Sequence, residues 1–253
     1  MENTIPAQPA GILAIDVGAT SIKFCAVSRE GELLESARRR RTPYPCTPER
    51  LVDVLTNRIV SSRYQEVGVG FPGEFRDGRV VHPGNLARLG GIATDIDPSL
   101  DERWRGYALQ DALCQATSSD IRVVNDATLA ALGSCNGAGV ELVVTLGTGV
   151  GLAMTLDRVI VPVRDVGAEI FFDGMTFDQA LGERARARDN SGWLHLLERA
   201  LNQFEKEFSP STVHLAGGNA RRVSISELKS VVTRVVIDGN EAPLRGAAKL
   251  FIS

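Results

Sequence analysis

Residues 12–27 read ILAIDVGATSIKFCAV, a β-rich run that is interrupted by a short polar turn. The apolar residues on either side predict two antiparallel strands joined by a tight turn. This hairpin presents Asp16, Gly18, Thr20, Ser21 and Lys23 together. Glycine lets a backbone approach a phosphate, hydroxyl and ammonium groups bind its oxygens, and an aspartate can hold a hydrated Mg2+. The turn therefore predicts a phosphate site, although ordinary hairpins use the same residue types.

The second half of the chain begins with the same succession of strand, turn and strand. Residues 141–163 read ELVVTLGTGVGLAMTLDRVIVPV, and the turn contains Gly147, Thr148, Gly149 and Gly151. This weak internal repeat predicts two related domains, each offering a hairpin to one phosphate chain. A cleft between the domains is then the expected ligand site.

The segments between and after the hairpins alternate between strand and helix patterns, which predicts an α/β fold. A third strand is expected over 31–41, and a helix over 47–64 from its threonine cap and apolar spacing. A buried strand follows at 67–71. A long helical stretch is expected over 177–208, ahead of another strand at 212–216.

The expected domain organisation places the N-terminal domain at two separated ranges of the chain. We expect a disordered tail over 1–10, an N-terminal domain over 11–122 plus 241–253 that is closed by a C-terminal helix, and a C-terminal domain over 123–240. At 253 residues the chain is long enough to bury the cores of two modest domains.

Bulk charge and cysteine usage exclude several classes of protein. A net charge of -3 gives no general attraction for nucleic acid or for an anionic membrane. The four cysteines are widely separated and form no C-x-x-C pair, so we expect no disulfide framework and a cytoplasmic protein. The start of the sequence resembles no signal peptide, and no stretch is apolar enough to span a bilayer.

A second candidate for chemistry lies at VVNDATLAA, residues 123–131. Asn125 and Asp126 come at the carboxyl end of a predicted strand and the start of a helix, where α/β sheets bind ligands. Asp126 can cap the helix, act as a general base toward a substrate hydroxyl, or do both.

Six motifs in this order resemble the ROK family of sugar kinases: IDVGATSIK, GVGFPGEF, GNL, VVNDATLAA, LGTGVG and LAGGN. The family belongs to the actin, sugar kinase and chaperone ATPase superfamily, and its polyphosphate glucokinases are the most similar members. The resemblance implies two ribonuclease-H-like domains of the actin/hexokinase type with an interdomain cleft, and a homodimer. It also implies transfer of a phosphoryl group from polyphosphate or ATP, with Mg2+, to a hexose hydroxyl, giving a hexose 6-phosphate.

The resemblance assigns a role to each motif. Asp126 is implied to be the general base, and Asp16 to hold the metal. The residues implied to contact phosphates or nucleotide are Asp16, Gly18, Thr20, Lys23, Gly147, Thr148, Gly149, Gly217 and Gly218. The residues implied to contact the sugar are Asn85, Asn125, Asp165 and Asp178.

The sequence departs from the family in the segment that would reach the sugar. Family members usually carry a glutamate, then Gly-His, and later another glutamate. Residues 164–180 read RDVGAEIFFDGMTFDQA and offer Asp165, Ala168 and Asp178 at those places. The shorter acids and the missing histidine predict a different hold on the sugar, or a different sugar.

The family's C-x-C-G-x-x-G-C zinc cluster has no counterpart after Asp165, so the resemblance implies no zinc. His82, His195 and His214 lack ligand partners at metal-binding spacing and are expected to be structural. Two alternatives to a sugar kinase stay open. One is a non-catalytic sensor of sugar or nucleotide with a degenerate pocket, and the other is a pantothenate-type kinase of the same superfamily.

Overall fold

The computed structural model describes residues 10–252, which divide into two compact units. The first unit contains the residues up to Val124 together with the segment that starts at Ala247, and the second runs from Asn125 to Gly246. The tail expected over 1–10 lies, apart from Ala10, outside the described residues.

The unit boundaries differ from the expected domain boundaries at two places. Residues 123–124 belong to the first unit because β7 (Asp120–Asn125) forms an edge of its sheet. Residues 241–246, expected in the N-terminal domain, belong to the second unit because α8 (Ala242–Gly246) packs on α4 (Asp126–Ser134) there.

The first unit is built on a five-stranded mixed sheet with the order β3-β2-β1-β4-β7. The opening hairpin is confirmed, because β1 and β2 pair antiparallel and β4 then pairs parallel with β1. The strands are β1 (Ile12–Val17), β2 (Ser21–Val27), β3 (Arg38–Arg41) and β4 (Glu66–Phe71). The third strand is shorter than expected, because Gly31 N–H bonds Ser28 O in a turn after β2.

Helices α1 (Pro48–Ser62) and α3 (Leu109–Thr117) pack on each other and share the core of the first unit. The cap predicted for α1 is confirmed, since the Thr47 side chain accepts a hydrogen bond from Arg50 N–H. The closing segment is helical, as expected, and takes the form of a 3-10 helix, η5 (Ala247–Phe251). It contacts β1 and β4, where Gly68 leaves room for Ala247.

The second unit repeats the sheet of the first, with the order β10-β9-β8-β13-β14. Its first three strands are antiparallel and the last two are parallel to β8. The strands are β8 (Val140–Leu146), β9 (Val150–Leu156), β10 (Val159–Val161), β13 (Thr212–Ala216) and β14 (Arg234–Gly239). The repeat that the two hairpins predicted is therefore present in the sheet order.

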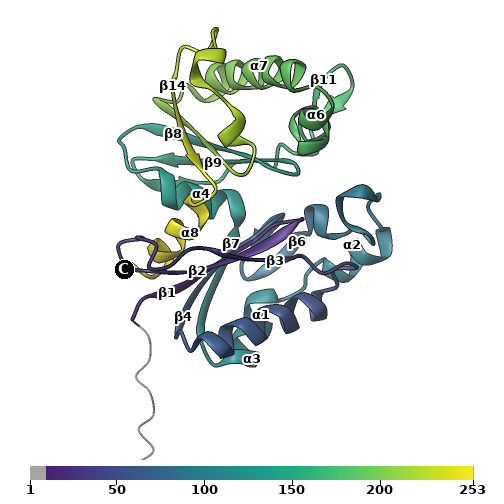
Figure 1. Cartoon of the computed structure of the whole chain (residues 1–253), viewed down its shortest axis with the longest axis vertical. Coiled ribbons are helices and arrows are strands. Elements are labelled where there is room, and N and C mark those ends of the chain that lie inside the picture. Colours follow the sequence, from purple (N-terminus) through teal and green to yellow (C-terminus); the bar gives the residue numbers. More distant parts are fainter. Residues whose placement is uncertain (1–9, 253) are drawn as a thin grey trace, which may run out of the picture. The chain divides into compact units, whose positions relative to one another are not determined.

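Helices cover both faces of the second sheet (Figure 1). Alternate residues of β8 enter different cores: Leu142 and Val144 pack with Trp193 of α7 (Asn190–Phe208), and Val143 packs with Ala130 of α4. This alternation is the period of two that a strand buried on both faces requires. The helical stretch expected over 177–208 is divided into α5 (Phe177–Leu181), α6 (Glu183–Arg188) and α7.

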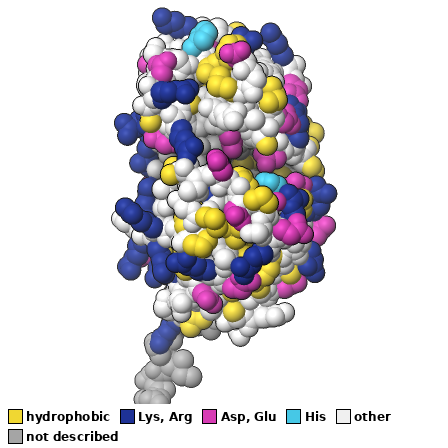
Figure 2. Space-filling view, turned by 90° about the vertical axis from the view of Figure 1, so that its right-hand side faces the viewer, with side chains coloured by type: hydrophobic (Ala, Val, Ile, Leu, Met, Phe, Trp, Pro, Cys, Tyr) yellow, Lys and Arg dark blue, Asp and Glu magenta, His cyan; other side chains and the backbone are white. Residues whose placement is uncertain are grey.

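Several short elements were not predicted from the sequence. They are β5 (Glu74–Arg76), β6 (Arg79–His82), α2 (Pro98–Trp104), β11 (Ile170–Phe172) and β12 (Met175–Thr176), besides the edge strand β14. None of the described helices combines the length and the apolar composition that a transmembrane span requires. On the face that Figure 2 shows, basic, acidic and apolar side chains are interspersed.

The crossing of α4 and α8 depends on two glycines. A Cβ at Gly133 would lie 1.9 Å from the carbonyl oxygen of Ala242, and a Cβ at Gly246 would lie 1.9 Å from that of Leu129. We predict that Gly133→Ala lowers the free energy of unfolding by about 1–3 kcal/mol through overpacking. Gly218→Ala is the control, because its Cβ would meet only Asn240 Oδ1 at 3.7 Å. Equal urea midpoints for the two variants would contradict the close crossing.

Candidate functional site

The turn between β1 and β2 is held from outside by Thr42, the residue that follows β3. Its hydroxyl donates to Gly18 O at 2.5 Å, and its N–H donates to Thr20 O at 3.2 Å. Within the turn, Gly18 N–H donates to Ser21 O at 3.1 Å. These bonds occupy carbonyl groups of the turn and so fix its backbone, which is the preorganisation that a phosphate site needs.

Asp16 and Lys23 are direct partners across the β1–β2 hairpin. Their side chains form an ion pair with 2.6 Å between Lys23 Nζ and Asp16 Oδ2, and they are only 14% and 9% exposed. The lysine predicted to face a phosphate therefore neutralises the acid predicted to hold the metal. A change at either residue alone leaves a mostly buried charge without this partner, which is costly.

Tyr44 connects the first turn to the loop that contains Asn85. Its hydroxyl lies 2.6 Å from Ala19 O and 3.3 Å from Asn85 O. Burial raises the pKa of Tyr44 to about 12, with a smaller contribution from Cys46 and an opposing one from Arg88. The hydroxyl is therefore protonated at neutral pH and donates. Sequence reasoning missed Tyr44, because a lone tyrosine between two prolines carries no functional signal.

The Asn85 loop is shaped by two glycines with positive φ. Gly73 has φ +151°, and a Cβ there would lie 2.2 Å from His82 O. Gly84 has φ +54°, and its Cβ would lie 2.9 Å from Pro72 O. Side chains do not fit at either position. The backbone around Gly73 therefore packs directly against the backbone around Gly84. Within this loop, Asn85 Oδ1 accepts a hydrogen bond of 3.0 Å from Arg88 Nε.

The turn between β8 and β9 is also fixed from outside. Gly147 O accepts hydrogen bonds from Glu183 N–H at 2.9 Å and from Asn219 Nδ2 at 3.1 Å. Gly147 N–H itself donates to Gly149 O at 3.0 Å. Asn219, which the sequence analysis did not single out, is the last residue of the LAGGN motif and explains how that motif reaches the turn.

The glycine pair of the LAGGN motif lies beside the same turn. Gly217 has φ +90°, and a Cβ there would lie 2.5 Å from Leu146 O. Asn219 N–H donates to Leu146 O at 2.9 Å. Within the second unit, the structure therefore brings together the Gly147–Gly149 turn and the Gly217–Gly218 pair, which sequence reasoning had linked only through the family resemblance.

Asn125, and not Asp126, is the N-cap of α4. Its Oδ1 accepts hydrogen bonds from Ala127 N–H at 2.9 Å and from Thr128 N–H at 3.2 Å. Asp126 is the first helical residue, and its Oδ1 accepts from Ala127 N–H at 2.8 Å. The sequence left two roles open for Asp126, helix capping and general base. Asn125 performs the capping. The helix N-terminus favours a negative charge at this position.

The two aspartates predicted to reach the sugar both accept hydrogen bonds from the backbone. Asp178 Oδ1 accepts from Val150 N–H at 2.7 Å, and a Cβ on Gly149 would lie 2.3 Å from the same oxygen. Asp165 Oδ1 accepts from Gly167 N–H at 3.0 Å. Asp178 therefore supports the second turn in this structure, and its role toward a sugar stays a prediction.

Glu169 was passed over in the sequence analysis although it is the only glutamate within residues 164–180. Its carboxylate pairs with Arg164 Nε at 2.8 Å and is partly exposed. An alignment that places Glu169 on the family's first glutamate puts Phe171 and Phe172 where the Gly-His pair is expected. This alignment also lacks the histidine. The chain therefore departs from the family whether Asp165 or Glu169 is placed on the first glutamate.

A model of the ROK family matches residues 12–162. The chain is 24% identical over 220 residues to the polyphosphate glucokinase of Mycobacterium leprae, which covers 82% of this chain but 63% of that protein. It is 23% identical over 255 residues to the polyphosphate glucokinase of Mycobacterium tuberculosis H37Rv, covering 94% of this chain and 90% of that protein. This chain therefore spans slightly less than two thirds of the first relative's length.

Solved structures with the same fold cover nearly the whole chain. The inorganic polyphosphate/ATP-glucomannokinase of Arthrobacter sp. strain KM superposes with a TM-score of 0.80 at 30% identity, covering 96% of this chain and 98% of that one. A ROK family glucokinase of Streptomyces griseus, solved with glucose and AMPPNP, gives a TM-score of 0.73 at 20% identity and covers 94% and 98%. The predicted α/β fold of the actin/hexokinase type is thus confirmed.

We predict that Asp178→Ala loosens the second turn, because Val150 N–H loses its acceptor. Amide hydrogen exchange at Val150 should become about threefold to tenfold faster, as expected for the loss of one such bond. Asp173→Asn is the matched control: this exposed acid has φ 49° in the β11–β12 turn, where asparagine is equally tolerated. Unchanged exchange at Val150 in Asp178→Ala would show that the acid does not support the turn.

Proposed function

The chain belongs to the ROK family, and we propose that it is a sugar kinase that transfers a phosphoryl group from polyphosphate or ATP to a hexose hydroxyl. One observation carries this proposal. The two units have sheets of the same type, and in each a glycine turn follows the first strand, β1 or β8. Residues outside each turn fix it by hydrogen bonds to its carbonyl groups. Duplicated, preorganised turns of this kind suit the phosphates of a phosphoryl donor.

On the donor side, the backbone of each turn and Lys23 would contact phosphate oxygens. Asp16 fits Mg2+, which typically takes one or two carboxylates and keeps several waters. The ion pair uses Asp16 Oδ2, so Oδ1 is the oxygen that we assign to the hydrated ion. Bound Mg2+ supplies neutralisation of the charge on the transferred phosphoryl group. The Arthrobacter relative is named for both polyphosphate and ATP, so we propose either as donor.

On the acceptor side, we propose Asp126 as the general base. Its carboxylate lies in the first turn of α4, and Asn125 fixes that turn through its two backbone bonds. The cap uses Asn125 Oδ1, and we assign the same side chain to a contact with a sugar hydroxyl. Asp126 would accept the hydroxyl proton as the oxygen attacks the terminal phosphoryl group.

The sugar itself is proposed only as a hexose resembling glucose. Asn85 and Asn125 lie in motifs shared with the family, whereas Asp165 and Asp178 already accept backbone hydrogen bonds. Acids that are held in this way have less freedom to reach a hydroxyl. We therefore expect a weaker discrimination among hexoses than the family's longer acids and histidine would give.

The role of Asp126 is tested by Asp126→Asn, which keeps the shape of the side chain but cannot accept the proton. We predict that kcat falls by roughly two to four orders of magnitude, while binding of AMPPNP measured by calorimetry is unchanged.

The control for Asp126→Asn is Asp111→Asn, an exposed acid in the first turn of α3. This variant shares the loss of a negative charge near a helix N-terminus and should retain kcat. A near-normal kcat for Asp126→Asn would remove this residue as the base.

The metal role of Asp16 is tested by Asp16→Asn, whose amide oxygen can still accept from Lys23. We predict that the Mg2+ concentration for half-maximal activity rises by about tenfold or more, while KM for the sugar changes little. Asp77→Asn, at an exposed turn position of the same unit, is the control. Equal losses in Mg2+ dependence and sugar KM would indicate a folding defect and contradict a metal role.

A further inference from the structure

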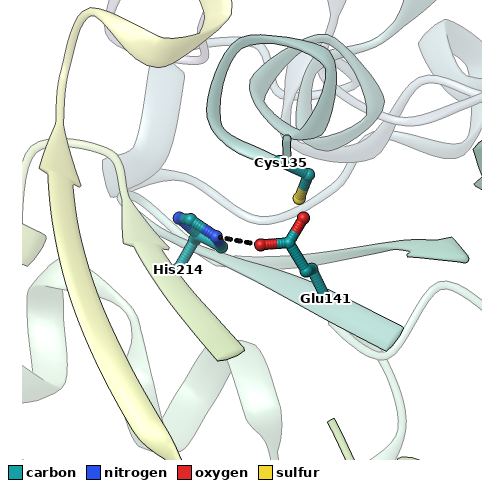
Figure 3. Close-up of side chains that lie close together, drawn as sticks. All are labelled: Cys135, Glu141 and His214. Atoms are coloured by element: carbon teal, nitrogen blue, oxygen red, sulfur yellow. Dashed lines mark hydrogen bonds and ion pairs between the residues drawn. The ribbon is translucent and has the colours of Figure 1, made fainter. Parts of the chain in front are cut away.

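Three metal-ligating side chains converge in the second unit at the end of α4 that is remote from Asp126. Cys135 follows the last residue of α4, Glu141 lies on β8 and His214 lies on β13. Figure 3 shows the thiol, the carboxylate and the imidazole turned toward one another. One ligand atom from each residue lies within 4.8 Å of the others.

The cluster is buried, and two of its residues lie in strands that are otherwise mainly apolar. Cys135, Glu141 and His214 are 2%, 4% and 6% exposed. Glu141 stands in VELVVTL and His214 in TVHLA, at positions where the strand pattern predicts apolar side chains. A buried carboxylate is costly unless it is paired. Glu141 therefore needs a stabilising partner at this position.

The ligand atoms are spaced for a small divalent cation. His214 Nε2 lies 3.2 Å from Glu141 Oε1. In a tetrahedral zinc site the Zn–N and Zn–O bonds are about 2.0–2.2 Å, so neighbouring ligand atoms are roughly 3.3–3.5 Å apart. The observed separation therefore needs only a small adjustment, and a thiolate, an imidazole and a carboxylate form a donor set that suits zinc.

Hydrogen bonds orient two of the three ligands from behind. His214 Nδ1 lies 2.8 Å from Asp238 Oδ2, so a proton on Nδ1 directs the lone pair of Nε2 toward Glu141. Glu141 Oε2 accepts a hydrogen bond of 2.7 Å from Gly137 N–H, which leaves Oε1 facing His214. Carboxylate support behind a ligating histidine is the usual arrangement at protein zinc sites.

A buried hydroxyl beside the cluster is a further polar group that a bound ion could use. Thr155 is the cross-strand partner of Glu141, so the two side chains share one face of the sheet. Within the described part of the chain, Thr155 Oγ1 is buried without a hydrogen-bond partner. A water bound as the fourth ligand of a metal would supply that partner.

We propose that Cys135, Glu141 and His214 form a binding site for a divalent transition-metal cation such as Zn2+. The site ties the carboxyl end of α4 to β8 and β13. Because α4 has nine residues, the metal lies about 13 Å along the helix from Asp126. Its role is to fix the helix that presents the proposed base. Neither the family's zinc cluster nor the motif spacing of the sequence predicted this site.

The competing explanation is a purely ionic cluster. Burial by itself lowers the pKa of His214, but its contacts with Asp238 and Glu141 outweigh burial and raise that pKa. Without a metal, the two carboxylates would hold the imidazole between them through these contacts. Such a cluster needs no thiol, so the participation of Cys135 distinguishes the two explanations.

The test is titration of the full chain, freed of metals by chelation and dialysis, with Co2+ and then Zn2+. We expect one Co2+ per chain, the thiolate-to-cobalt charge-transfer absorption of a cysteine-bound ion, and its displacement by Zn2+. Free Zn2+ at about 100 times its Kd should raise the melting temperature by roughly 5–10 °C. Absence of the thiolate absorption in the wild-type protein overturns the proposal.

Two variants and a matched control make the assignment specific. Cys135→Ser should abolish the charge-transfer absorption, and Cys114→Ser, a half-buried cysteine of the first unit, should keep it. If Cys135→Ser fails to fold, Glu141→Gln provides the test, because its amide oxygen can still accept from Gly137 N–H. Glu141→Gln should weaken Co2+ binding by about tenfold or more. Retained absorption in Cys135→Ser, or unchanged affinity in Glu141→Gln, overturns the site.

Discussion

Hydrogen bonds from outside fix the carbonyl groups of two glycine turns, and the rest of the proposed site depends on them. In the first unit Thr42 binds Gly18 O and Thr20 O, and in the second Asn219 and Glu183 N–H bind Gly147 O. A turn whose carbonyl groups are already bound has a fixed backbone and need not reorganise when an anion arrives. The same sheet order surrounds both turns, so each unit supplies a rigid support for its own.

Helix α4 links the proposed chemistry to the stability of the second unit. Asn125 caps its first turn, Asp126 follows the cap, and Gly133 allows the close approach of α8. The proposed metal site would hold the other end of the same helix. The position of the base would then depend on interactions at both ends of α4 rather than on contacts at Asp126 alone.

The sequence predicted the elements whose apolar residues recur with a clear strand or helix period. It missed the elements whose form depends on tertiary contacts. The two hairpins and α1 followed from alternation, helical spacing and a threonine cap. Strand β14 was missed because the short segment RVVIDG has no distinct hydrophobic period. The C-terminal helix was expected, but its 3-10 form, η5, was not, because its packing on β1 and β4 determines that form. The two glycine turns could be located from their glycines, but the side chains that bind their carbonyl groups, Thr42, Tyr44 and Asn219, come from distant segments. Likewise, Cys135, Glu141 and His214 meet only in the folded chain.

Steady-state turnover decides whether this ROK family chain is a sugar kinase. Purified protein is assayed with ATP and with polyphosphate, each with Mg2+, against a panel of hexoses and amino sugars, with pantothenate as a further acceptor. We predict formation of a hexose phosphate with at least one donor, at a rate that saturates with the sugar. Sugar or nucleotide binding without turnover of any hexose, or phosphorylation of pantothenate alone, would contradict it.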